Sequence, residues 1–176
     1  MKVLRTLMVG VAASALMAGS AVAADLMMEP PAMDEVMTDW SGVYIGANLG
    51  AQQFYGPLTV NEGDVELVGG FNAQMDNFLF GAEGFLGGYW NDYPDQGFYA
   101  GAEARLGVLV TPEVLLYGAG GALIRTSGNS YWTGGGGLEL LVSDSVSLDL
   151  EYKHLWEMGG GYQSNSISAG LNLHMN

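Results

Sequence analysis

The sequence contains no cysteine in its 176 residues, which excludes a fold held together by disulfide bonds. Basic residues are also scarce: five Lys and Arg stand against 19 Asp and Glu, and the formal net charge is −14. Nucleic-acid-binding proteins present a basic surface, so this charge excludes a nucleic-acid partner on electrostatic grounds. No calcium loop of the EF-hand type accompanies the acidic residues, and we interpret them as groups that solvate loops.

Long apolar runs are missing after the N-terminal region, so any membrane span must be built from strands rather than helices. Residues 1–23 have the three parts of a secretory signal peptide: the basic Lys2 and Arg5, an apolar run over residues 7–17, and small residues before Ala24. Export would leave three basic residues against 19 acidic ones, a net charge of −16. Residues 24–39, acidic and containing Pro and Met, are expected to form a periplasmic tail or linker.

From residue 40 onward, apolar and polar residues alternate in segments that are separated by turn residues. Residues 145–156 show the pattern most clearly, because Val146, Leu148 and Leu150 fall on one side of an extended strand and Ser147 falls on the other. We expect eight strands, over residues 40–51, 65–74, 78–90, 98–110, 114–125, 131–142, 145–156 and 165–175. Residues 52–64 are expected to form the longest loop, which is the best candidate for contact with an external ligand, itself unknown.

Eight amphipathic strands fit either a soluble barrel with an apolar interior or an outer-membrane barrel with an apolar exterior. The turns after even-numbered segments are tight and those after odd-numbered segments are longer, as in outer-membrane barrels. A soluble barrel would also need basic and acidic residues mixed over its outer surface, and the basic residues are too few. We therefore predict an all-β fold for residues 40–176, an eight-stranded antiparallel up-and-down transmembrane β-barrel.

Aromatic residues mark both ends of the expected apolar band. Such girdles are typical of proteins whose outer surface crosses a bilayer. The predicted girdle at the loop end contains Trp90, Phe98, Trp132 and Trp156, and the predicted girdle at the opposite end contains Trp40, Phe78 and Tyr117.

The polar faces of the strands are expected to fill the interior, where charges must pair. Aligning Trp90 with Phe98 across neighbouring strands sets Glu83 opposite Arg105 and predicts an ion pair between them. Clustered carboxylates could also form an active site, but charge networks of this kind commonly plug outer-membrane barrels, and we favour the structural interpretation. The predicted interior network comprises Glu83, Glu103, Arg105, Glu139, Asp149, Glu151 and Lys153.

The sequence resembles the small OmpA-like, opacity-type outer-membrane barrels of alphaproteobacteria. The similar stretches are residues 40–50 (WSGVYIGANLG), 80–84, 105–107, 115–121, 147–152 and 169–172. The resemblance implies a surface antigen in the outer membrane of a Gram-negative bacterium, surrounded by lipid and lipopolysaccharide. It also implies barrel-assembly machinery and periplasmic chaperones as partners during biogenesis. The family usually ends in an aromatic residue that this machinery reads; here the expected assembly signal is Ser168, Gly170, Leu173 and Met175, with Met175 in place of the aromatic.

Catalysis finds little support in the sequence. Some eight-stranded barrels are lipid A esterases with a His-x-Ser pair, whereas His154 is followed by Leu155 and Trp156. His154 and His174 fall near opposite rims and cannot share a metal or haem. We predict a non-enzymatic structural protein of the envelope without catalytic residues, cofactor or metal. A narrow porin-like channel is the alternative, and a lipid A-modifying enzyme or a loop-mediated adhesin is less favoured.

Overall fold

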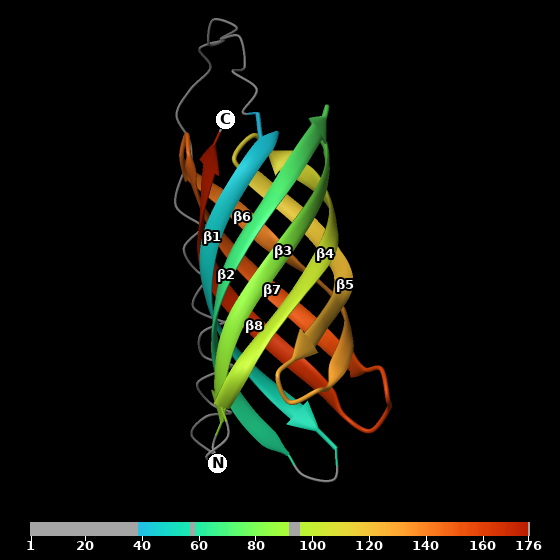
Figure 1. Cartoon of the computed structure of the whole chain (residues 1–176). Coiled ribbons are helices and arrows are strands. Elements are labelled where there is room, and N and C mark those ends of the chain that lie inside the picture. Colours follow the sequence, from blue (N-terminus) through green and yellow to red (C-terminus); the bar gives the residue numbers. More distant parts are fainter. Residues whose placement is uncertain (1–38, 57–58, 92–95, 176) are drawn as a thin grey trace, which may run out of the picture. The chain divides into compact units, whose positions relative to one another are not determined.

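The computed structural model describes residues 39–56, 59–91 and 96–175, which form a closed barrel of eight antiparallel strands (Figure 1). Each strand pairs with its sequence neighbours, and β8 closes the barrel against β1. The strands are β1 (Gly42–Tyr55), β2 (Val60–Met75), β3 (Phe78–Asn91), β4 (Gln96–Thr111), β5 (Val114–Arg125), β6 (Ser130–Ser143), β7 (Val146–Glu157) and β8 (Gln163–Met175). The predicted eight-stranded antiparallel fold is confirmed. The expected signal peptide, and residues 24–38 of the expected tail, lie outside the described residues.

The two ends of the barrel differ in the length of the connections between strands, as the sequence predicts. At the turn end, β2–β3, β4–β5 and β6–β7 are joined by tight turns around Asp76, Pro112 and Asp144. At the loop end, the four remaining connections are longer. In outer-membrane barrels the short turns are periplasmic and the long loops face outward.

The alternation of each strand places large apolar side chains outside and polar side chains inside. Leu67, Leu106 and Ile124 are about three-fifths exposed on the outer face, whereas Glu139 and Ser147 are completely buried inside. A soluble barrel would show the reverse arrangement, so this outer surface matches lipid rather than water. Within the part of the chain that the structure describes, no helix is long and apolar enough to cross a membrane.

The expected long loop over residues 52–64 is wrong. β1 continues to Tyr55 and β2 begins at Val60, so most of this stretch is paired strand. Glu62 and Asp64 face the interior and are buried. Their polarity indicated a loop, but inside a barrel the same polarity marks the inward face of a strand. The stretch proposed for an external ligand is therefore mostly barrel wall.

The predicted register between β3 and β4 is also wrong. Glu83 pairs with Glu103, Gly81 pairs with Arg105, and Trp90 pairs with Gln96 rather than with Phe98. The prediction assumed that aromatic residues at the same membrane depth, Trp90 and Phe98, are direct cross-strand partners. Strands in a barrel are tilted, so residues at equal depth on neighbouring strands are offset from each other in register.

Two residues predicted for the aromatic girdle at the turn end lie inside the barrel instead. Trp40 is 1% exposed, donates from Nε1 to the Pro112 carbonyl oxygen (3.0 Å), and meets the His174 ring edge-on. Tyr117 is 7% exposed and donates its hydroxyl hydrogen to Asp149 (2.9 Å). Trp40 precedes β1, so strand alternation does not fix its direction. In β5 both faces are apolar, so the alternation of residues could not decide whether the face that carries Tyr117 points inward or outward.

Candidate functional site

The interior of the barrel is the candidate functional site, because it gathers every Lys and Arg of the described residues. Arg105, Arg125 and Lys153 are all buried there. Eight carboxylates surround them, those of Glu62, Asp64, Glu66, Glu83, Glu103, Glu139, Asp149 and Glu151. The interior therefore holds a clear excess of acidic groups over basic ones, arranged in three successive layers.

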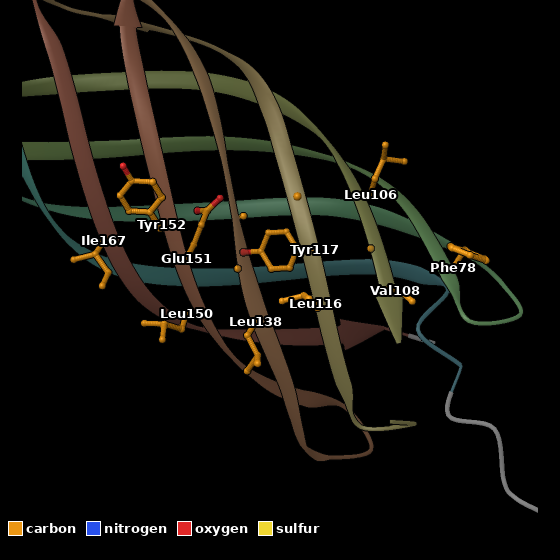
Figure 2. Close-up of a pocket in the computed structure, with 14 residues that line it drawn as sticks. Phe78, Leu106, Val108, Leu116, Tyr117, Leu138, Leu150, Glu151, Tyr152 and Ile167 are labelled. Carbon is orange, nitrogen blue, oxygen red and sulfur yellow. The ribbon is translucent and has the colours of Figure 1, made fainter. Parts of the chain in front are cut away.

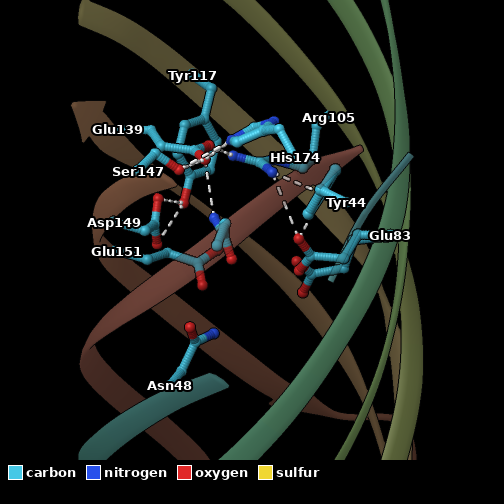
Figure 3. A network of polar contacts seen from close by, with 12 residues as sticks. Tyr44, Asn48, Glu83, Arg105, Tyr117, Glu139, Ser147, Asp149, Glu151 and His174 are labelled. Atoms are coloured by element: carbon cyan, nitrogen blue, oxygen red, sulfur yellow. Dashed lines mark hydrogen bonds and ion pairs between the residues drawn. The ribbon is translucent and has the colours of Figure 1, made fainter. Parts of the chain in front are cut away.

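The layer nearest the turn end is built on Arg105 of β4 (Figure 3). Its Nη2 lies 2.8 Å from Glu139 Oε2, and its Nη1 lies 3.4 Å from Glu83 Oε2. Nη1 also donates to the Tyr44 hydroxyl (2.7 Å), which itself donates to Glu83 (2.6 Å). The guanidinium carbon sits 4.0 Å from the centre of the Tyr117 ring. The expected contact between Glu83 and Arg105 exists, but Glu139 of β6 is the nearer partner.

Glu139 is the centre of a second set of contacts in this layer. It accepts hydrogen bonds from Ser147 Oγ (2.5 Å) and Asn172 Nδ2 (2.8 Å), and its Oε1 lies 3.3 Å from His174 Nε2. Ser147 Oγ is also 2.9 Å from His174 Nε2. In a catalytic triad the carboxylate holds the far nitrogen of the histidine, and the serine faces substrate. Here the Glu139 carboxylate accepts a hydrogen bond from Ser147 itself, and Glu139 and Ser147 are both fully buried. These contacts therefore stabilise the packing of the interior.

The middle layer is built on Lys153 of β7. Its Nζ lies 3.1 Å from Glu103 Oε1 and 3.3 Å from Glu151 Oε2. The same ammonium sits 4.6 Å from the centre of the Phe85 ring, which gives it a cation–π contact as well. Within the described residues, no group of three or more His, Cys, Asp and Glu side chains has the arrangement needed to hold a metal ion.

The layer nearest the loop end is built on Arg125 of β5. Its Nη1 lies 2.9 Å from Glu62 Oε1, and Gln52 Nε2 donates to the same carboxylate oxygen (2.8 Å). The guanidinium is surrounded by aromatic rings, of which Tyr89 (4.3 Å) and Phe54 (4.6 Å) are the nearest. The sequence did not predict this layer, because the polar residues around Gln52 and Glu62 indicate a loop.

A small cavity lies between the two layers nearer the loop end. It has a volume of about 30 Å³ and is lined in part by Asp64, Glu66 and Tyr99. Asp64 Oδ2 accepts from the Tyr99 hydroxyl (3.0 Å), whereas Oδ1 is buried without a hydrogen-bond partner in the described part of the chain. The cavity is large enough for a water molecule to satisfy that oxygen, but not for an organic substrate.

Apolar side chains close the interior beyond the charged layers. At the turn end, Trp40, Leu79 and Leu115 are at most 1% exposed and pack in one cluster with Tyr117. At the loop end, a second cluster includes the aromatic residues around Arg125. Among the described residues, buried apolar and charged groups thus succeed one another along the barrel axis.

A shallow groove of about 830 Å³ lies on the outer, apolar surface (Figure 2). Its floor includes Gly118 and Gly136, which are cross-strand partners on β5 and β6. Larger apolar residues such as Leu106, Leu116 and Leu150 form its walls. In a bilayer this groove faces acyl chains; Tyr117 and Glu151, which also line it, are inward-facing residues that are buried in the barrel.

The remaining predicted site residues lie on the outer face or on β8. Five residues of the predicted girdles point outward and are between about two-fifths and two-thirds exposed: Phe78, Trp90, Phe98, Trp132 and Trp156. Leu173 and Met175 of the predicted assembly signal also point outward, whereas Ser168 and Gly170 lie on the opposite, inward face of β8 and are partly buried. The reading of these four residues by assembly machinery stays a prediction.

Comparisons with known proteins agree with the geometry. No protein-family model matches the chain. The 25 kDa outer-membrane immunogenic protein of Brucella ovis is 25% identical, over 97% of this chain and 98% of the relative. Neisserial surface protein A has a TM-score of 0.61 at 15% identity, covering 77% of this chain and 98% of that structure. Ail, the attachment invasion locus protein of Yersinia pestis, has a TM-score of 0.50 at 11% identity, covering 77% and 99%.

The Brucella relatives confirm the predicted resemblance to outer-membrane surface antigens, and the solved structures confirm the resemblance to small outer-membrane barrels. The Brucella relatives, which are named as outer-membrane proteins, also confirm the predicted location, the outer membrane of a Gram-negative bacterium. The solved structures support the fold alone, as a transmembrane barrel.

Proposed function

We propose that this outer-membrane barrel is a non-enzymatic structural protein, which contributes to envelope integrity and exposes short loops at the cell surface. The observation that supports the proposal best is the packed interior. Arg105 of β4 alone contacts Tyr44 of β1, Glu83 of β3 and Glu139 of β6. Such bridges tie distant strands together across the barrel and fill the interior of its described part with paired side chains.

The proposed absence of catalysis rests on the surroundings of both histidines. The Ser147–His174 pair is sealed inside the barrel. His154 contacts Trp156 and Asn165, neither of which is a nucleophile of a hydrolase. The Brucella relatives are named for their location and their immunogenicity, which agrees with a surface protein of structural role.

A narrow cation channel is the second candidate, and the acidic excess of the interior favours it. Eight carboxylates around three basic side chains would attract cations if the interior opened. Opening would require Arg105 to leave Glu139 and Arg125 to leave Glu62. We therefore rank the closed structural barrel above the channel.

Adhesion through a sulfated ligand is not proposed. The solved structure of Ail is described as a complex with the heparin analogue sucrose octasulfate. In the described part of this chain, all Lys and Arg side chains face the interior of the barrel, so the loop end presents none of them outward. A polysulfated ligand needs several basic side chains on the surface that it meets, and the described residues supply no Lys or Arg there.

A deletion strain tests the structural proposal. Cells without the protein should admit detergent and hydrophobic antibiotics more readily, and the wild-type protein should restore the barrier. A variant in which residues 158–161 are replaced by a shorter turn should restore the barrier equally, because the proposed structural role depends on the barrel and not on this loop. Unchanged permeability in the deletion strain, or failure of the shortened loop to restore the barrier, would overturn the proposal.

A further inference from the structure

A small polar cluster interrupts the apolar outer face of β7 and β8 near the loop end. Tyr152, His154 and Trp156 are successive outward residues of β7, and Asn165 is the cross-strand partner of His154 on β8. The Tyr152 hydroxyl donates to Asn165 Oδ1 (2.7 Å), and the same oxygen lies 2.7 Å from His154 Nδ1. The imidazole also packs on the Trp156 ring, with centroids 4.4 Å apart. Four side chains thus form one ordered unit that faces away from the barrel.

The hydrogen bonds in this unit fix which atoms remain available to a ligand. A side-chain amide oxygen only accepts, so the hydrogen in the contact with Asn165 Oδ1 belongs to His154 Nδ1. His154 Nε2 and the amide nitrogen of Asn165 make no hydrogen bond to the described residues, and both side chains are partly exposed. Free polar groups in contact with hydrocarbon would be costly. The cluster therefore suits the level of the lipid head groups, where Trp156 also fits.

Charge narrows the class of ligand. His154 is the outward-facing side chain, among residues 39–56, 59–91 and 96–175, that can take up a positive charge. Arg105, Arg125, Lys153 and His174 are all buried inside. An anion approaching this acidic barrel from the membrane thus meets one cationic contact, with an amide donor beside it.

Neighbouring residues favour a sugar-bearing anion over a bare one. Gln163, the cross-strand partner of Trp156, is exposed, and Gln53 lies opposite Asn165 on β1. Amide side chains of this kind bind hydroxyl groups. On β3, β4 and β6, the outward residues at the loop end include Trp90, Phe98 and Trp132, whereas His154 and its neighbouring amides lie together on β7, β8 and β1.

We propose that His154 and Asn165 bind a phosphate group on the sugar of an outer-leaflet glycolipid. The His154 imidazolium and the Asn165 amide donate hydrogen bonds to the phosphate oxygens. Trp156 packs beside the part of the lipid that is nearest to its head group. This binding site goes beyond the structural role of the barrel and does not depend on it.

Lipid retention by the folded barrel tests the proposal. The protein is reconstituted in phosphatidylcholine nanodiscs that contain a small fraction of diphosphoryl lipid A, and the lipid A that stays bound is counted by native mass spectrometry. His154→Leu should lower retention about tenfold, the effect of losing one charge-assisted hydrogen bond. His154→Arg should preserve retention, because it restores the cation. Leucine and arginine are both compatible with a β-strand at this interfacial position, so both variants are expected to fold.

The controls separate this site from general attraction to lipid. Gln96→Leu, which removes an exposed polar side chain at the loop end of β4, should leave retention unchanged. Lipid A stripped of its phosphates should be retained no better by wild type than by His154→Leu. Equal retention of the two lipid forms, or of diphosphoryl lipid A by wild type and His154→Leu, would overturn the proposal. So would displacement of the lipid by millimolar inorganic phosphate, which would identify a site for the free anion.

Discussion

Replacing Arg105 by alanine is expected to destabilise the folded barrel by about 3–5 kcal/mol, the usual cost of removing one partner from a buried ion pair. Arg105 is 3% exposed and is the cation nearest to Glu139, which is completely buried. Without it, the carboxylates of Glu139 and Glu83 lose a basic partner in a water-poor interior. Urea unfolding of the protein in lipid vesicles measures the loss.

A double-mutant cycle shows whether the loss comes from this pairing. Glu139→Gln combined with Arg105→Ala should recover part of the stability, because the carboxylate that Arg105 neutralised is then uncharged. Arg105→Met, which keeps the packing against Tyr117, should remain strongly destabilised. Strict additivity of Arg105→Ala and Glu139→Gln, or wild-type stability in Arg105→Met, would show that the ion pair does not hold the interior.

Leu150→Arg is expected to destabilise the barrel by about 2–4 kcal/mol, because it places a charge on the lipid face near the bilayer midplane. Leu150 is 43% exposed, and its cross-strand partners are Leu138 and Ala169. It lies six residues before Trp156, or about 20 Å along the strand. At the tilt of barrel strands this is roughly 15 Å below the girdle, about half of the ~30 Å hydrocarbon thickness of a bilayer.

The matched control carries the same charge outside the membrane. Asp144→Arg, in the exposed β6–β7 turn, should leave the free energy of unfolding within ~0.5 kcal/mol of wild type. Leu150→Ala separates the loss of apolar contact from the cost of the charge. If Leu150→Arg unfolded at the same urea concentration as Leu150→Ala, the face that carries Leu150 would not be in contact with lipid.

The sequence predicted the fold because the alternation of polar and apolar residues is a local signal. β5 was predicted from Val114 to Arg125, and the structure places it there. The difference between tight turns and longer connections could also be read from the chain. Both features depend on neighbours in sequence, so they need no knowledge of which strands meet.

The interior was predicted only in part, because its contacts depend on three-dimensional register. Arg105 and Glu139 are 34 residues apart and meet across the barrel rather than on neighbouring strands. Strand tilt brings them together, and no periodicity reveals it. Arg125 was overlooked for a different reason: its partner Glu62 is in a polar stretch that resembles a loop unless the interior of the barrel is known to be charged.

Single-channel recording in a planar bilayer is the most direct test of a barrel sealed by its own side chains. The wild-type protein is inserted from samples whose SDS-gel mobility changes on boiling, which shows that the barrel is folded. The layers built on Arg105, Lys153 and Arg125 should keep it closed, so the recording should show no discrete current steps under an applied voltage. Steady, cation-selective steps from the folded wild-type protein would contradict this and establish the narrow channel instead.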